Sequence, residues 1–137
     1  MKPLMMIAVL AVSALVCGCG AGVRAADLFI VYRSGATTGA RLTLLVNEEG
    51  GAHCNGRPAN ISNDQLVEAR SISEALEKPS SEHLSLPARA GSVLSYYVRD
   101  ANGSVSFADD SAGQPAVFHE LQMFVEVLAQ RVCHLPL

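Results

Sequence analysis

The sequence predicts an α+β domain in which an antiparallel sheet of about four to five strands carries two helices on one face. Strand-like segments come in neighbouring pairs joined by short turns, and an amphipathic helix follows each group of strands. Single strands and helices do not alternate along the chain, as they would in a parallel sheet. The predicted order is strand, strand, short strand, helix, strand, strand, helix, in one domain at residues 27–137.

The first two strands are expected to form a hairpin. Apolar residues predict a strand at about 27–33, and the alternation of apolar and polar residues predicts a returning strand at about 40–46. The turn between these strands consists of Ser34, Gly35, Ala36, Thr37, Thr38 and Gly39. Small and polar residues with two glycines are typical of an exposed turn.

A short strand and a helix follow this hairpin. The strand is expected at about 52–54, near an edge of the sheet. Ser62 and Gln65 form a capping box, and apolar residues at helical spacing extend the predicted helix over about 63–77. Because residues 78–91 are polar and contain two prolines, we expect an irregular connection there.

The second half of the domain repeats the order of hairpin and helix. A strand at about 92–99 is expected to pair with one around Phe107, and the Asn102-Gly103 dipeptide between them is typical of a two-residue hairpin turn. Pro115 suits the first position of a helix, and apolar residues at helical spacing continue from there nearly to the C-terminus.

The first 26 residues are expected to direct export. Residues 1–18 contain one lysine and an apolar run too short to cross a hydrocarbon core of about 30 Å as a helix, which is typical of a signal peptide. The segment ending at Cys19 resembles the lipobox of bacterial lipoproteins, which implies a lipid on Cys19 and a tether at residues 19–26. The alternatives are cleavage after Ala25, giving a soluble secreted protein, and an uncleaved anchor.

Two cysteines, Cys54 and Cys133, remain in the domain under either cleavage. In an oxidising compartment an even pair predicts a disulfide, and the long chain segment between them would make it worth on the order of 4 kcal/mol. Free thiols and a metal site are the alternatives. Zinc is disfavoured because His53 and His134 are directly adjacent to the cysteines, whereas zinc ligands are usually separated by about two to four residues.

The composition argues against several functions. The formal net charge is −3 without a cluster of lysine and arginine, so we expect no nucleic-acid partner. Tryptophan is absent and nearly all aromatic residues fit core positions, so we expect no exposed aromatic platform, although Tyr97 lies on the strand face opposite Tyr96. Because no catalytic, phosphate-binding or metal-binding motif is complete, we expect no enzyme, cofactor or metal.

Two family resemblances bear on function. Through residues 33–35 (Arg-Ser-Gly), 54–56 (Cys-Asn-Gly) and the strand around Tyr96, the domain resembles small secreted or lipid-anchored proteins of actinobacterial type. More distantly it is similar to emfourin, a small α+β inhibitor of thermolysin-like metalloproteases. The shared features are the Arg-Ser-Gly hairpin, the strand pair around Tyr96 and Phe107, and Pro115 at the start of the last helix. This resemblance implies protease inhibition.

These observations lead to the hypothesis of a lipid-anchored extracytoplasmic domain that binds a protein partner, such as a protease or an envelope protein. The turn at residues 34–39 is the candidate contact element. A metalloprotease inhibitor is one version of this hypothesis. An enzyme or metal carrier without a sequence signature is the alternative from a different class.

Overall fold

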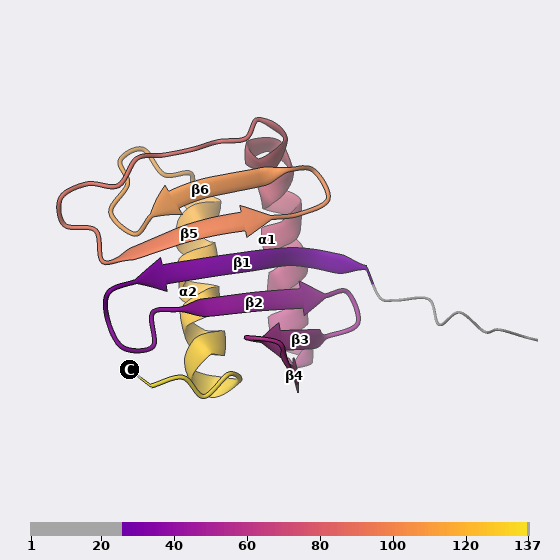
Figure 1. Cartoon of the computed structure of the whole chain (residues 1–137). Helices are drawn as coiled ribbons and strands as arrows, with labels where there is room; N and C mark the ends of the chain where they lie inside the picture. The colour runs from indigo at the N-terminus through magenta and orange to yellow at the C-terminus, as the bar shows by residue number, and fades with distance from the viewer. Residues whose placement is uncertain (1–25, 137) are drawn as a thin grey trace, which may run out of the picture.

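The computed structural model describes residues 26–136, so the predicted signal peptide and Cys19 lie outside the described residues. Within this range six strands form one antiparallel sheet, and two helices lie against the same face of it (Figure 1). This arrangement confirms the predicted α+β class. It contains slightly more strands than expected from the sequence.

The sheet has the order β4-β3-β2-β1-β5-β6, and each neighbouring pair is antiparallel. The strands are β1 Asp27–Gly35, β2 Leu42–Asn47, β3 Gly51–Cys54, β4 Arg57–Asn60, β5 Leu94–Arg99 and β6 Ser104–Ala108. The first four strands form a meander, and β5 then pairs with the remaining edge of β1. The longest strand, β1, therefore lies in the interior of the sheet between β2 and β5.

Strand β4 is missing from the sequence-based expectation. It is short and polar and contains Pro58, features that suit an edge strand. It pairs with β3 because Asn55 and Gly56 reverse the chain with φ values of 50° and 82°. An Asn-Gly pair with two positive φ values is typical of a tight hairpin turn, so the sequence did contain a signal for this strand.

Helix α1 (Asn63–Ser81) begins as predicted and ends four residues later than predicted. The Ser62 hydroxyl accepts a hydrogen bond from the Gln65 amide at 3.2 Å, and the Gln65 side chain accepts one from the Ser62 amide at 2.9 Å. The helix continues for two residues past Pro79, although this proline removes one intrahelical hydrogen bond. In that turn Ser80 is buried and donates to Asp100 at 2.6 Å.

The connection after α1 protects the edge of β6. The Leu86 amide donates to the Ser106 carbonyl at 2.9 Å, and the Ser106 amide donates to the Leu84 carbonyl at 3.0 Å. These hydrogen bonds pair backbone groups at the edge of β6. Unpaired backbone groups on an exposed edge strand can otherwise pair with another chain and promote aggregation. Leu84 and Leu86 also pack against the core.

Two boundaries in the second half differ from the prediction by one residue. The β5–β6 turn is closed by the Asp100 amide donating to the Gly103 carbonyl at 3.0 Å, so Ala101 and Asn102 are its central residues. Asp100 fixes this position, because its carboxylate accepts hydrogen bonds from the amides of both Asn102 and Gly103. Helix α2 (Ala116–Arg131) starts immediately after Pro115 rather than at it.

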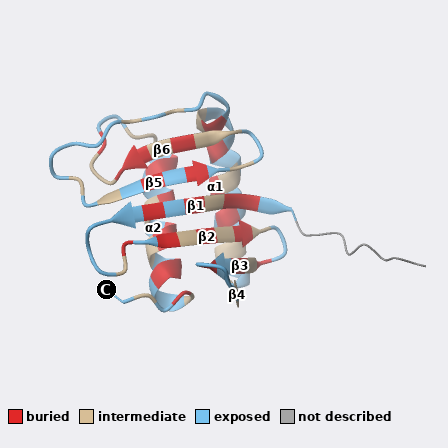
Figure 2. Ribbon diagram, in the orientation of Figure 1, coloured by how far each residue is buried: buried red, intermediate tan, exposed pale blue. Residues whose placement is uncertain are grey.

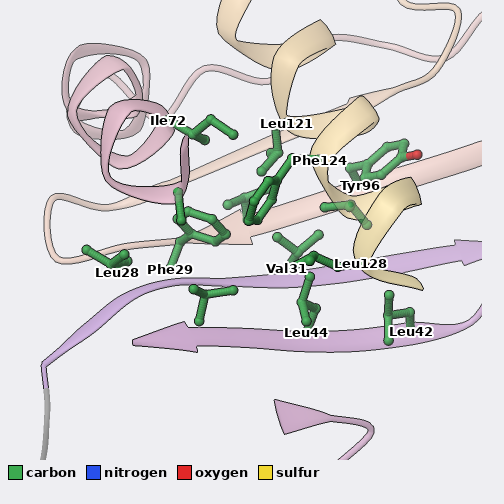
Figure 3. Close-up of a cluster of buried hydrophobic side chains, with 14 of the residues drawn as sticks. Leu28, Phe29, Val31, Leu42, Leu44, Ile72, Tyr96, Leu121, Phe124 and Leu128 are labelled. Carbon is green, nitrogen blue, oxygen red and sulfur yellow. The ribbon is translucent and has the colours of Figure 1, made fainter. Parts of the chain in front are cut away.

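The core fills the space between the helices and one face of the sheet. Figure 2 shows buried and exposed residues alternating along the strands, as expected when one face is covered. In Figure 3, side chains of β1, β2, β5 and both helices converge in this layer. The largest fully buried side chains include Phe29, Leu42, Leu44, Ile72, Leu76, Phe118, Leu121, Phe124 and Leu128.

Aromatic contacts tie helix α2 to the sheet. The ring of Phe107 is stacked between Tyr96 and Phe118, with centroid distances of 5.1 and 4.2 Å. Phe29 meets Phe124 edge to face at 6.2 Å. Each such pair contributes about 0.5–1.5 kcal/mol beyond the burial of its surface.

Candidate functional site

The turn predicted at residues 34–39 begins two residues later in the structure, because Ser34 and Gly35 are the last residues of β1 and pair with Ser95 and Leu94 on β5. Residues 36–41 connect β1 to β2 at one end of the sheet (Figure 1). We keep the term turn for residues 34–39, which are the end of β1 and the first four residues of this connection. Ser34 through Thr38 are exposed, Gly39 is partly buried and Ala40 is buried. The domain begins at the opposite end of β1, at Asp27. At about 3.3 Å per residue, the end of β1 at the turn is therefore about 26 Å from Asp27.

The side chain of Arg33 is hydrogen-bonded to the backbone at the end of this turn. This side chain enters the helix-covered side of the sheet, where the residue is 5% exposed. Its Nε donates to the Ala40 carbonyl at 2.9 Å, and its Nη2 donates to the Gly39 carbonyl at 2.8 Å. The planar fork of the guanidinium thus binds two successive carbonyls at the end of the turn.

The same guanidinium links the turn to helix α2. Arg33 Nη1 donates to Glu126 Oε2 at 3.1 Å, and the Gln130 side chain donates to the other Glu126 oxygen. Because the Glu126 side chain is 47% exposed, solvent screens this ion pair and reduces its net contribution to stability. We call Arg33 and its three acceptors, on Gly39, Ala40 and Glu126, the arginine clamp.

Tyr96 lies beside this clamp, directly across from Arg33 on β5. Burial raises the pKa of the Tyr96 phenol above its ordinary value near 10.0, while the neighbouring Arg33 charge acts in the opposite direction. The phenol therefore stays neutral at physiological pH. Its ring is buried and stacked on Phe107, so it contributes to the packing of the core near the turn.

Two close approaches confine the turn further. Gly39 has a φ of +76°, and a Cβ atom at this position would collide with the Pro136 carbonyl oxygen. At Gly35 a Cβ atom would lie 2.5 Å from the Val93 carbonyl oxygen. The turn is thus held between the C-terminal residues and the start of β5, with Ala36, Thr37 and Thr38 as its exposed tip.

Cys54 and Cys133 form the predicted disulfide, which joins β3 to the residues that follow α2. The two sulfurs are bonded to each other, so neither is present as a thiolate ligand. Among residues 26–136, no group of three or more His, Cys, Asp or Glu side chains is placed to hold a metal ion. Neither of the two helices in this range has the length and apolar character needed to span a bilayer.

The structure contains an exposed aromatic pair that the sequence did not predict. Tyr32 and Tyr97 lie directly opposite each other on β1 and β5, with ring centroids 5.9 Å apart and planes tilted by 32°. They are 37% and 43% exposed, on the face of the sheet without helices. The expectation of no exposed aromatic platform is therefore wrong, although the opposite orientations of Tyr96 and Tyr97 are confirmed.

A groove of about 370 Å³ lies beside this pair. Its lining includes both tyrosines, Ser34, Ser95, Ser106, Leu86 and Ala88. Ser34 belongs both to the groove and to the turn at residues 34–39, so the two features are continuous on the surface. Arg33 also contributes to the lining, but its guanidinium is engaged on the other side of the sheet, and the other lining residues of the groove are uncharged.

Comparisons of the chain with protein-family models, with curated proteins and with solved structures found no match.

Proposed function

We propose that this protein is an exported binding domain that contacts a protein partner through the turn at residues 34–39, and that it is not an enzyme. The arginine clamp is the observation that carries the proposal, because it binds the Gly39 and Ala40 carbonyls and so orders the end of an exposed turn. A turn that is already ordered loses less conformational entropy when a complex forms. Its tip offers methyl and hydroxyl groups for contact.

A lipid on Cys19 is part of this proposal. Cys19 precedes Asp27 by eight residues, which span at most about 28 Å when extended. Since β1 runs from Asp27 to the turn, an anchored domain can point the turn away from the membrane (Figure 1). The disulfide is consistent with the oxidising compartment that this location requires. Soluble secretion after cleavage at Ala25 would leave the turn equally available.

A thermolysin-like metalloprotease is the first partner class to test. The resemblance to emfourin suggests it, and a clamped turn with small side chains at its tip suits insertion into a cleft. Inhibition would follow from occupation of the cleft by a rigid loop. An enzyme or metal carrier remains the alternative, and it predicts turnover or metal uptake by the purified protein.

The experiment is a titration of the mature protein against a thermolysin-like protease with a chromogenic peptide substrate. We expect inhibition that Thr38→Arg weakens by about tenfold or more, because the longer charged side chain blocks docking of the tip. Ser71→Arg is the matched control, since Ser71 is an exposed hydroxyl residue on α1. Equal inhibition by wild type and Thr38→Arg would move the contact away from the turn.

A wider search for protein partners uses a photoreactive amino acid at Thr38 in growing cells. A discrete crosslinked product from position 38, absent when the same group is at Ser71, supports a partner at the turn. If neither position yields a product and no protease is inhibited, the proposed protein-binding role of the turn is wrong.

The anchor is tested separately with Cys19→Ala and a clickable fatty-acid analogue. We expect label in the wild type, loss of label in the variant, and transfer of the variant from the membrane to the soluble fraction. Unlabelled, soluble wild-type protein would contradict the anchor and favour cleavage after Ala25.

A further inference from the structure

The open face of the sheet carries a regular set of side chains on β1, β2, β5 and β6. The strand register defines its rows. The central row is Thr43, Tyr32, Tyr97 and Ser106. The row nearest the turn contains Ser34 and Ser95, and the row on the other side contains Leu45, Ile30, Arg99 and Ser104. The tyrosine pair therefore lies in the middle of this face, within the groove described above.

The face differs from the rest of the surface in charge. Arg99 is exposed in the outer row, and Arg41 is exposed immediately before the buried Leu42, which places Arg41 on the same open side. None of the residues in the three rows is acidic. The two helices, in contrast, carry six carboxylates against three lysine and arginine side chains. A locally basic face on an acidic protein complements an anionic ligand.

The groups on this face match the chemistry of a sugar chain. The C–H faces of pyranose rings pack on aromatic rings, and Tyr32 and Tyr97 offer two adjacent rings that are partly exposed to water. The hydroxyls of Ser34 and Ser95 lie in the groove and can donate and accept hydrogen bonds there. The Ser106 hydroxyl also lines the groove and is already hydrogen-bonded to the Ser85 hydroxyl at 2.8 Å. The guanidinium groups of Arg41 and Arg99 suit carboxylates, which they can bind through two parallel hydrogen bonds.

We propose that the open face binds an acidic polysaccharide, a chain of uronic acid units whose rings stack on the Tyr32–Tyr97 pair. Arg41 and Arg99 lie on opposite sides of this pair and are separated by two strand spacings and four residues along the strands, about 16 Å. Several linked sugar rings are needed to span that distance. The face therefore recognises an extended chain and not a single sugar.

This ligand is independent of the protein partner proposed for the turn. A domain tethered in the cell envelope could use the sheet face to hold an envelope polysaccharide while the turn contacts a protein. Because Ser34 belongs to both surfaces, a long sugar chain reaches the base of the turn but not its tip.

The test measures tyrosine fluorescence of the mature protein during titration with hexagalacturonate. The chain has no tryptophan, and two of its three tyrosines belong to the pair, so the signal reports on the proposed site. We expect a dissociation constant between about 10 µM and 1 mM that increases with salt, since carboxylates are paired with arginines. Cellohexaose, which is neutral, should bind about tenfold more weakly or not at all.

Three variants locate the site, and nuclear magnetic resonance measures their binding because one of them alters the fluorophore. Tyr97→Thr should weaken hexagalacturonate binding by about tenfold, and Arg99→Gln should weaken it severalfold and reduce its salt dependence. Val67→Ser, at a 65% exposed position on α1, should leave binding unchanged. Thermal unfolding of each variant separates loss of the site from loss of the fold.

Several outcomes overturn the proposal. These are the absence of binding at millimolar hexagalacturonate, equal affinity for cellohexaose, and tighter binding of single-stranded oligothymidylate. A doubling of the apparent mass with concentration, abolished by Tyr97→Thr, would show that a second copy of the chain occupies the face.

Discussion

Each face of the sheet contains residues of an unexpected kind. The exception on the covered face is hydrogen-bonded to the protein, whereas the exceptions on the open face are partly exposed to water. On the covered face the exception is Arg33, a charged residue that is 5% exposed and hydrogen-bonded to two carbonyls and a carboxylate. On the open face the exceptions are Tyr32 and Tyr97, aromatic residues that are 37% and 43% exposed.

This contrast separates structural residues from residues available to a ligand. A buried charge is tolerated when it is hydrogen-bonded, and each of the three guanidinium nitrogens of Arg33 donates to a group of the fold itself. Among the described residues that are not exposed, no buried side-chain polar atom lacks a hydrogen-bond partner. The exposed rings, in contrast, still have one surface in water and gain free energy when a ligand covers it. Function is therefore expected on the open face and at the turn.

The largest effect should come from removing the disulfide that closes the covered side. We expect Cys54→Ala with Cys133→Ala to lower the free energy of unfolding by on the order of 4 kcal/mol, because the bond closes a loop of 79 residues in the unfolded chain. Urea unfolding followed by circular dichroism measures the change. A variant as stable as the wild type would contradict this role, and reduction of the wild type provides the control.

The same substitution at two neighbouring positions compares the faces directly. Tyr96→Thr removes a ring that is 4% exposed and stacked on Phe107, so we expect a loss of about 3 kcal/mol in the free energy of unfolding. Tyr97→Thr should cost about 1 kcal/mol or less, because its ring is partly in water and threonine also favours strands. Equal losses in the free energy of unfolding for the two variants, measured by urea unfolding, would contradict the assignment of Tyr96 to the covered face and Tyr97 to the open face.

Replacing the clamp residue should have an intermediate effect. Arg33→Met preserves much of the buried length but leaves the Gly39 and Ala40 carbonyls without this donor, at a cost of about 2 kcal/mol in the free energy of unfolding. Amide hydrogen exchange should also become faster in residues 34–40. Glu126→Gln is the control, with a loss of about 0.5 kcal/mol, since the ion pair is partly exposed. Unchanged exchange in Arg33→Met would show that the turn is ordered without the clamp.

The smallest effect concerns alkaline pH. Because the pKa of Tyr96 is raised in the folded protein, the neutral phenol favours folding below the ordinary tyrosine pKa. This contribution is lost as the pH rises through the folded-state pKa, since the unfolded chain then ionises more readily. Urea unfolding at about pH 8 and about pH 11 should show a drop in stability that Tyr96→Phe reduces. An identical drop in the variant would exclude Tyr96 as its source.

Several elements were predictable because their signals are local. The Ser62–Gln65 capping box marked the start of α1, and the alternation of Leu42, Leu44 and Val46 marked the buried side of β2. The α+β class and the partnership of Cys54 with Cys133 followed from the order of elements and from the even number of cysteines. Strand β4 also had a local signal, the Asn55-Gly56 turn.

The exposed position of the tyrosine pair was harder to predict from the sequence. In β1 the alternation places Arg33 on the buried side and Tyr32 on the exposed side, the reverse of what hydrophobicity alone predicts. The pattern makes sense once Ala40, Gly39 and Glu126 are known to surround the guanidinium. Similarly, α1 passes Pro79 because its last turn packs against the β5–β6 hairpin through Ser80 and Asp100.

By itself the sequence determined both helices and five of the six strands, because caps, turns and periodicity act over a few neighbouring residues. The even number of cysteines in the domain determined which cysteines pair. Tertiary structure decided the rest. The order of the strands brings Tyr32 beside Tyr97 and the packing of α2 brings Glu126 to Arg33, over separations of 65 and 93 residues along the chain. Contacts at such separations depend on how elements pack, and local propensities carry no information about them.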